Sequence, residues 1–147
     1  MSSHDEITNL IYTYAERMDA GQFEAIADML AHTVISMEGV DSVVEGRDAV
    51  LQAYTSSAQT YDDSTPKTKH VITNVIVNVD EVAGTATCRS YFTVLQAVPD
   101  RLPLQPILAG RYRESFERVD GAWRMATMHV IWDLVGDLTA HMKVGLG

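Results

Sequence analysis

Two residues of this chain have side chains suited to moving a proton near neutral pH. His70 lies in the first of several long strand-like segments, and Asp19 lies just before Gly21, where the first helix-like segment ends. An imidazole titrates near neutral pH, and a carboxylate bonded to one ring nitrogen fixes its tautomer and stabilises the imidazolium. A carboxylate in the last turn of a helix also faces the negative end of the dipole, which costs about 0.3 to 1 kcal/mol when exposed. The residues alone leave both open: Asp19 is a functional group or an exposed polar residue, and His70 is a base or an ordinary histidine of a sheet.

Other motifs with known chemistry are missing from the sequence. The histidines show neither H-x-x-x-H nor H-x-x-E-H spacing, and Cys88 has no cysteine partner. There is no Gly-rich phosphate loop and no G-x-S-x-G elbow. We therefore expect no metal, no cofactor and no serine hydrolase chemistry. The five histidines are His4, His32, His70, His129 and His141.

The composition indicates one folded domain, which we assign to residues 1–147. Hydrophobic residues make up 46% and charged residues 21% of the chain, which is typical of a folded protein. Eleven Lys and Arg against twenty Asp and Glu give a net charge of −9, which argues against nucleic acid or an anionic membrane as a partner. The chain has one cysteine, no signal-peptide pattern at its start, and no apolar stretch near the ~18 to 20 residues that span a bilayer. We expect a cytoplasmic location and no membrane segment.

Helix signals come first along the chain, and strand signals follow. An S-x-x-E capping box from Ser3 to Glu6 opens a helix that ends at Gly21. Asp120-Gly121 is the strongest hairpin-turn signal. The order predicts an α+β fold in which helices close one face of a curved antiparallel sheet and leave a pocket. The other expected elements are helices over residues 22–30 and 47–61, a short strand over 33–38, a loop over 62–66, a Pro-rich connection over 99–106, and long strands over 67–80, 85–98, 107–119 and 122–133.

This order of elements and several motifs resemble the SnoaL-like branch of the nuclear-transport-factor-like (NTF2-like) superfamily. The motifs are Tyr14 with Asp19, KHVITN at 69–74, GRY at 110–112 and FERVDGAWR at 116–124. The resemblance covers nearly the whole chain and implies a conical α+β barrel. The superfamily includes dehydratases, dehydrohalogenases, polyketide cyclases, ketosteroid isomerases and plain ligand binders, so the fold leaves the function open.

The resemblance implies a catalytic pair. In scytalone dehydratase and hexachlorocyclohexane dehydrochlorinase, an aspartate at the end of the first helix orients a histidine on the first long strand, which removes a proton during elimination. Asp19 and His70 match these two positions. Scytalone dehydratase has a second histidine and an asparagine on later strands, where this chain has Cys88 and Tyr112. The handling of substrate and water in that enzyme therefore does not transfer to this chain.

Four more residues are candidates for binding the substrate. Tyr14, on the apolar face of the first helix, could hold a substrate oxygen, and Tyr54 could contribute an edge of the pocket. Arg111 shares strand parity with Ile107, and His129 lies on a face that the resemblance turns inward. Arg111 could then stabilise negative charge that develops on an enolate or a leaving group, and His129 could act as a second acid or a donor. The alternative for both tyrosines is the core, and for Arg111 it is the solvated face of the sheet.

The leading interpretation is a small cofactor-independent enzyme that removes a proton from an apolar, cyclic small molecule, with elimination, isomerisation or cyclisation as the outcome. An isomerase of the ketosteroid type, with Tyr14 and Glu38, is one alternative. That reading needs an inward carboxylic acid at Glu114, which has the opposite parity to Arg111 and is therefore expected to point outward. A binding or assembly module without chemistry is the other alternative. Long strands with more apolar surface than three helices can cover also predict a homo-oligomer, most simply a two-fold dimer.

Overall fold

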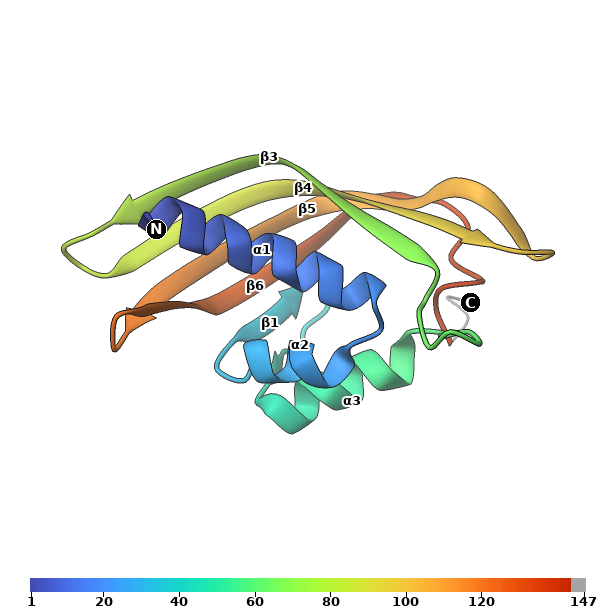
Figure 1. Ribbon diagram of the computed structural model, residues 1–147, viewed down its shortest axis with the longest axis horizontal. Coiled ribbons are helices and arrows are strands. Elements are labelled where there is room, and N and C mark those ends of the chain that lie inside the picture. The colour runs from blue at the N-terminus through green and yellow to red at the C-terminus, as the bar shows by residue number, and fades with distance from the viewer. Residues whose placement is uncertain (144–147) are drawn as a thin grey trace.

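The computed structural model describes residues 1–143, which form three helices and a six-stranded sheet. Within these residues, no helix combines the length and the apolar character needed to cross a membrane. Figure 1 shows the elements in chain order. They are α1 (Ser3–Asp19), α2 (Phe23–Met29), β1 (Val34–Met37), β2 (Val44–Glu45), α3 (Arg47–Ser57), β3 (Thr68–Asp80), β4 (Thr85–Val98), β5 (Leu102–Val119) and β6 (Ala122–Val135).

The helices begin and end close to the predicted positions. The hydroxyl of Ser2 accepts a hydrogen bond from the Asp5 amide at 3.1 Å, so the N-cap is Ser2 and not the predicted Ser3. Helix α3 ends at Ser57, several residues before the predicted end. In α1, residues at helical spacing are buried against the sheet, and Tyr14 is among them.

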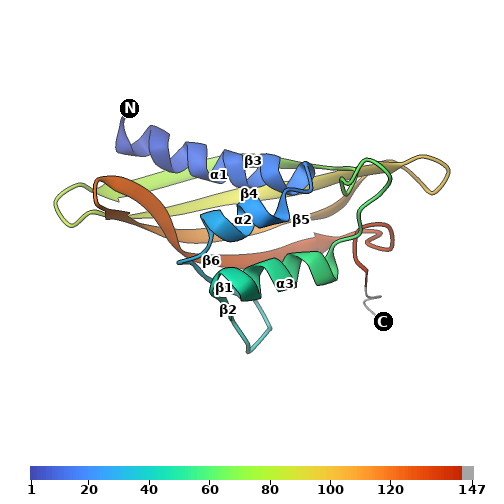
Figure 2. The same ribbon diagram turned by 60° about the horizontal axis from the view of Figure 1, so that its bottom comes forward.

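The sheet has the order β2-β1-β6-β5-β4-β3 and curves around the helices. The long strands β3 to β6 pair antiparallel in succession, as predicted, whereas the short strand β1 pairs parallel to β6. Figures 1 and 2 both show the three helices on one side of the sheet, with α1 lying along β3. The predicted α+β fold is confirmed, although the sheet is mixed and not purely antiparallel. We call the side of the sheet that faces the helices the inner face and the other side the outer face.

Two turns set the strand pairing. Asp120 and Gly121 both have positive φ, 52° and 82°, as a type I′ hairpin turn requires. This confirms the hairpin between β5 and β6. Strand β5 begins at Leu102, so most of the expected Pro-rich connection over residues 99–106 is part of the sheet. The predicted start of this strand was therefore five residues too late.

Register shifts decide which side chains reach the inner face. In β3 the pairing with β4 shifts between Thr73 and Ile76, next to Asn74 with its φ of 55°. In β5 the pairing shifts near Leu108, where two consecutive residues, Ile107 and Leu108, are both buried. A one-residue shift moves every later side chain to the other face. Strict alternation counted from Ile107 therefore gives the wrong face for the rest of β5.

Candidate active site

The carboxylate of Asp19 and the ring of His70 form a tight buried pair. The distance from Asp19 Oδ1 to His70 Nδ1 is 2.6 Å, and the two side chains are 12% and 6% exposed. Asp19 also accepts hydrogen bonds from the His70 amide at 2.9 Å and from the Thr68 hydroxyl at 2.9 Å. With Nδ1–H donated to a carboxylate, Nε2 is the nitrogen left free to accept a proton. The three donors stabilise the carboxylate that the end of α1 disfavours.

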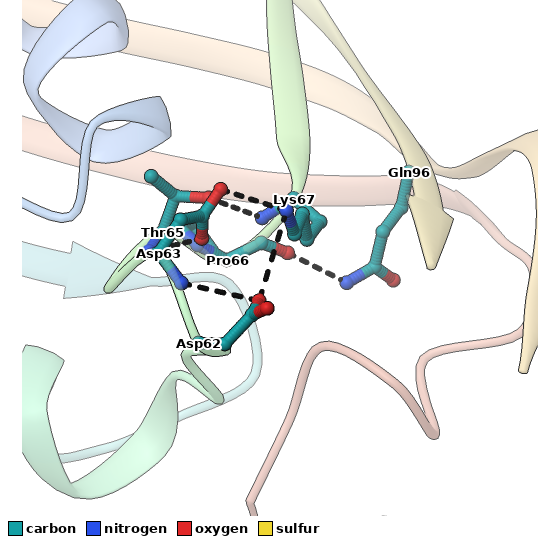
Figure 3. A network of polar contacts seen from close by, with 6 residues as sticks. All are labelled: Asp62, Asp63, Thr65, Pro66, Lys67 and Gln96. Carbon is teal, nitrogen blue, oxygen red and sulfur yellow. Dashed lines mark hydrogen bonds and ion pairs between the residues drawn. The ribbon is translucent and has the colours of Figure 1, made fainter. Parts of the chain in front are cut away.

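The loop before β3 fixes the start of the strand that carries His70. Figure 3 shows the Asp63 carboxylate bonded to Thr65 and to the Lys67 ammonium. The distance from Lys67 Nζ to Asp63 Oδ2 is 2.7 Å. Gln96 on β4 donates from Nε2 to the Pro66 carbonyl at 2.9 Å and to the Ala140 carbonyl at 3.1 Å. Gln96 thus ties the loop and the segment after β6 to the sheet beside Thr68, its register partner.

His141 is a site residue that sequence reasoning missed. It follows Ala140 in the segment after β6, is 7% exposed, and lies close enough to His70 and Asp19 for their charges to act on it. Burial, followed by the charge of His70, lowers the pKa of His141 to about 4, so its imidazole is neutral at pH 7. No local spacing in the sequence relates His141 to His70, because a folded turn brings them together.

Three tyrosines line the inner face next to this pair. The hydroxyls of Tyr14 and Tyr54 are 2.6 Å apart, and the Tyr112 ring contacts Tyr14 edge-on, with centroids 6.2 Å apart. Burial raises the pKa of Tyr54 to about 12 and also raises the pKa of Tyr14 and of Tyr112 well above the usual value, so all three remain protonated. The inward positions expected for Tyr14 and Tyr54 agree with the structure, and these hydroxyls are suited to donate to an oxygen.

Glu114 lies on the inner face, contrary to the prediction. It is 5% exposed, and its Oε1 has no hydrogen-bond partner. Burial raises the pKa of Glu114 to about 8, so the carboxyl group is mostly protonated at pH 7. If Glu114 were ionised, its charge would raise the pKa of all three tyrosines and of Cys88, its register partner on β4. The register shift in β5 is the reason that the parity argument failed.

Four buried side-chain atoms lack a hydrogen-bond partner in the part of the chain that the structure describes. They are Ser90 Oγ, Gln96 Oε1, Glu114 Oε1 and His141 Nδ1. A buried polar atom without a partner costs about 1 to 3 kcal/mol, and native proteins hold few of them. Gln96 and His141 lie near His70, since Gln96 binds the carbonyl of Ala140 and the charge of His70 acts on His141. Ser90 on β4 is the register partner of Tyr112 on β5. These atoms can bind water or the polar groups of a ligand.

Arg111 and His129 are not in this cluster, so their predicted inward orientation is wrong. Arg111 forms two hydrogen bonds to Asp133, at 2.8 and 3.0 Å, on the outer face. His129 Nδ1 lies 2.7 Å from the Ser36 hydroxyl, and its Nε2 lies 2.9 Å from Glu38. Glu38 is exposed, and the hydrogen bond with His129 lowers its pKa, so it does not act as a buried base. Between residues 1 and 143, no cluster of three or more His, Cys, Asp or Glu is arranged to hold a metal.

Comparison with known proteins agrees with this architecture. A family model described as SnoaL-like domain matches residues 1–129. The chain belongs to the SnoaL-like family. The predicted resemblance is therefore confirmed, including its placement in the NTF2-like superfamily. No curated protein matches the sequence of this SnoaL-like chain.

Solved structures similar to this SnoaL-like domain share its fold at low identity. An NTF2-like protein with a cystatin-like fold from Novosphingobium aromaticivorans has a TM-score of 0.72 and 21% identity, over 93% of this chain and 85% of that one. A protein of the same organism, provisionally named a scytalone dehydratase, has a TM-score of 0.70 and 19% identity, over 91% and 86%. A protein from Catenulispora acidiphila in complex with S-DNPA has a TM-score of 0.71 and 22% identity, over 88% and 92%. At these identities the likeness establishes the fold alone.

Proposed function

We propose that this SnoaL-like domain is a cofactor-independent enzyme that removes a proton from carbon in an apolar, cyclic small molecule. The observation that carries the proposal is the 2.6 Å hydrogen bond between Asp19 and His70 in a buried setting. A base oriented in this way contributes about 10² to 10⁴ to the rate of a proton transfer. The predicted catalytic roles of His70 and Asp19 are retained here as part of the proposal.

In the proposed step, His70 Nε2 accepts a proton from a carbon next to a carbonyl or a leaving group. The electron pair of the broken C–H bond moves into the substrate, where it forms an enol or a double bond. The Asp19 carboxylate stabilises the imidazolium through Nδ1–H. His141 stays uncharged beside the pair and therefore repels the imidazolium less than a second cation would.

The acid of the reaction would be Glu114, supported by the tyrosines. Its carboxyl group carries a proton at pH 7, and so it can protonate a departing oxygen or donate to a carbonyl oxygen. Tyr14 and Tyr54 would donate to the same oxygen region. The isomerase alternative needs an inward acid at Glu114, and the buried position of Glu114 supports that part of it. The same alternative needs Glu38 as the base, and the exposure of Glu38 argues against that part. His70 remains the base in either outcome.

A binding module without turnover is the second candidate. The four buried atoms without partners favour a polar ligand on the inner face whether or not it reacts. The complex with S-DNPA of the Catenulispora acidiphila protein supports small-molecule binding on this fold. The two candidates differ in what they predict for His70 and Asp19.

The experiment compares His70→Ala, Asp19→Asn and the double variant after a screen of cyclic ketones, alcohols and halides. Each single variant should lower kcat by about 10² to 10⁴, and the double variant should be little worse than either, because the two residues act as one unit. His129→Ala is the matched control, since this histidine also has a carboxylate partner but lies on the outer face. An unreduced rate in His70→Ala would overturn the assignment of the base. Binding in the parent without turnover of any compound in the panel would favour the second candidate.

A further inference from the structure

Two arginines of the outer face stand out because they lack partners. Among the residues that the structure describes, the side chains of Arg89 and Arg113 form no hydrogen bond and no ion pair, whereas the side chain of each of the other six arginines binds at least one side chain or carbonyl. Arg89 and Arg113 are also direct register partners on β4 and β5. Like charges that face each other across two strands are destabilising. In a chain with nine more acidic than basic residues, this unpaired cation pair needs an explanation.

Neutral hydrogen-bond donors lie next to these arginines, in the adjacent row of register partners across the sheet. The register runs from Asn78 through Thr87 and Ser115 to Thr127, two residues away from the row of Arg89 and Arg113. Residues two apart on a strand share a face. The Ser115 and Thr127 hydroxyls are 2.6 Å apart, so one donates to the other and one O–H remains free. These residues and the two arginines line a hollow of about 510 Å³, together with Ile76, Cys88, Glu114 and His129.

His129 of β6 also lines the hollow. His129 is the register partner of Arg113, but both of its ring nitrogens are engaged, one with Ser36 and one with Glu38. Arg113 contributes to lowering the pKa of Glu38, so this carboxylate lies within electrostatic range. Glu38 nevertheless bonds to His129 and to neither arginine. The two guanidinium groups therefore keep their donors free for a ligand.

We propose that this hollow binds the phosphate group of a small molecule. Two guanidinium groups, a free hydroxyl, Thr87 and Asn78 offer more donors than the two oxygens of a carboxylate can use. A phosphate group presents three strong acceptor oxygens and about two negative charges. The volume lies within the range of roughly 300 to 1,000 Å³ for small-molecule sites, so the ligand is larger than free phosphate. The net charge of −9 argues against a nucleic acid as the source of the phosphate.

The test titrates inorganic phosphate, and then a phosphorylated sugar and its unphosphorylated form, into the protein in a low-salt buffer without phosphate. Binding is followed through the Nε–H resonances of the arginines by NMR. The resonances of Arg89 and Arg113 should shift with phosphate and with the phosphorylated sugar, and not with the free sugar. Arg89→Gln and Arg113→Gln should each weaken binding about tenfold, as expected for the loss of a charge-assisted contact. Arg124→Gln, which removes an arginine paired with Glu117, should change the affinity less than twofold.

Two results would overturn the proposal. One is equal phosphate affinity in the parent and in the double variant Arg89→Gln/Arg113→Gln. The other is an absence of phosphate binding together with self-association that the double variant abolishes in sedimentation experiments, which would make this face a contact between copies. Neither result bears on His70 and Asp19, which lie on the other side of the sheet.

Discussion

Replacing Glu114 with glutamine tests whether the inner face holds a neutral carboxyl group. Burial raises the pKa of Glu114 from 4.5 to about 8 in the folded chain. Between these values the folded state binds one proton more than the unfolded state, so the free energy of unfolding falls as pH rises. The interval is 8 − 4.5 = 3.5 pH units. At about 1.4 kcal/mol per unit, the wild type loses on the order of 5 kcal/mol over this range.

The glutamine variant keeps a neutral side chain of similar shape and lacks this dependence. Urea denaturation is measured at fixed protein concentration from pH 5 to 9. The free energy of unfolding of the variant should rise relative to that of the wild type up to about pH 8, and above pH 8 the difference between the two should stay constant. Glu117→Gln on the same strand is the control, because that carboxylate is part-exposed and paired with Arg124, so it carries no comparable burial cost. A difference between Glu114→Gln and wild type that does not vary between pH 5 and 8 would refute the reasoning. It would mean that Glu114 is ionised in the folded protein.

Two further outcomes can be checked with standard measurements. Gly110→Ala should lower the free energy of unfolding by about 3 kcal/mol or more, because a methyl group there would overlap the Ile131 carbonyl oxygen and lie 2.8 Å from Phe92 Cζ. A urea midpoint equal to that of the wild type would contradict this close approach. Exposed apolar side chains on β3 and β4, Val71 and Tyr91 among them, predict a homo-oligomer, most simply a two-fold dimer. Light scattering that returns the monomer mass of 16.2 kDa at micromolar concentration would disprove it.

Local signals in the sequence predicted the helices and strands, and they also pointed to Asp19 and Tyr14 of the candidate site. Asp120-Gly121 predicted its hairpin because the turn requires positive φ at both residues. The position of Asp19 at the end of α1 is unfavourable in isolation, and the structure supplies the partners that compensate for it. Tyr14 was expected on the buried face because apolar residues recur at helical spacing around it.

The sequence failed where one extra residue changes the face of a strand. Arg111 and His129 were assigned to the inner face through the resemblance, and Glu114 was assigned to the outer face because its parity is opposite to that of Arg111. A single shift in β5 accounts for both Arg111 and Glu114. Nothing in the residue types around Leu108 marks such a shift in advance. His141 was missed for another reason, since its approach to His70 depends on the path of the chain after β6 and not on any spacing.

The inner face separates two carboxyl groups by their surroundings. Asp19 accepts hydrogen bonds from two N–H donors, one of them on the ring of His70, and from one O–H donor. Glu114 has an oxygen without any donor, and burial keeps it protonated. Acid and base chemistry in one site needs groups in contrasting surroundings, and the proposed division of roles depends on this contrast. A carboxyl group without a donor is suited to supply a proton, and a carboxylate with three donors is suited to orient a base, so the proposed roles of Glu114 and of Asp19 with His70 follow this contrast in surroundings.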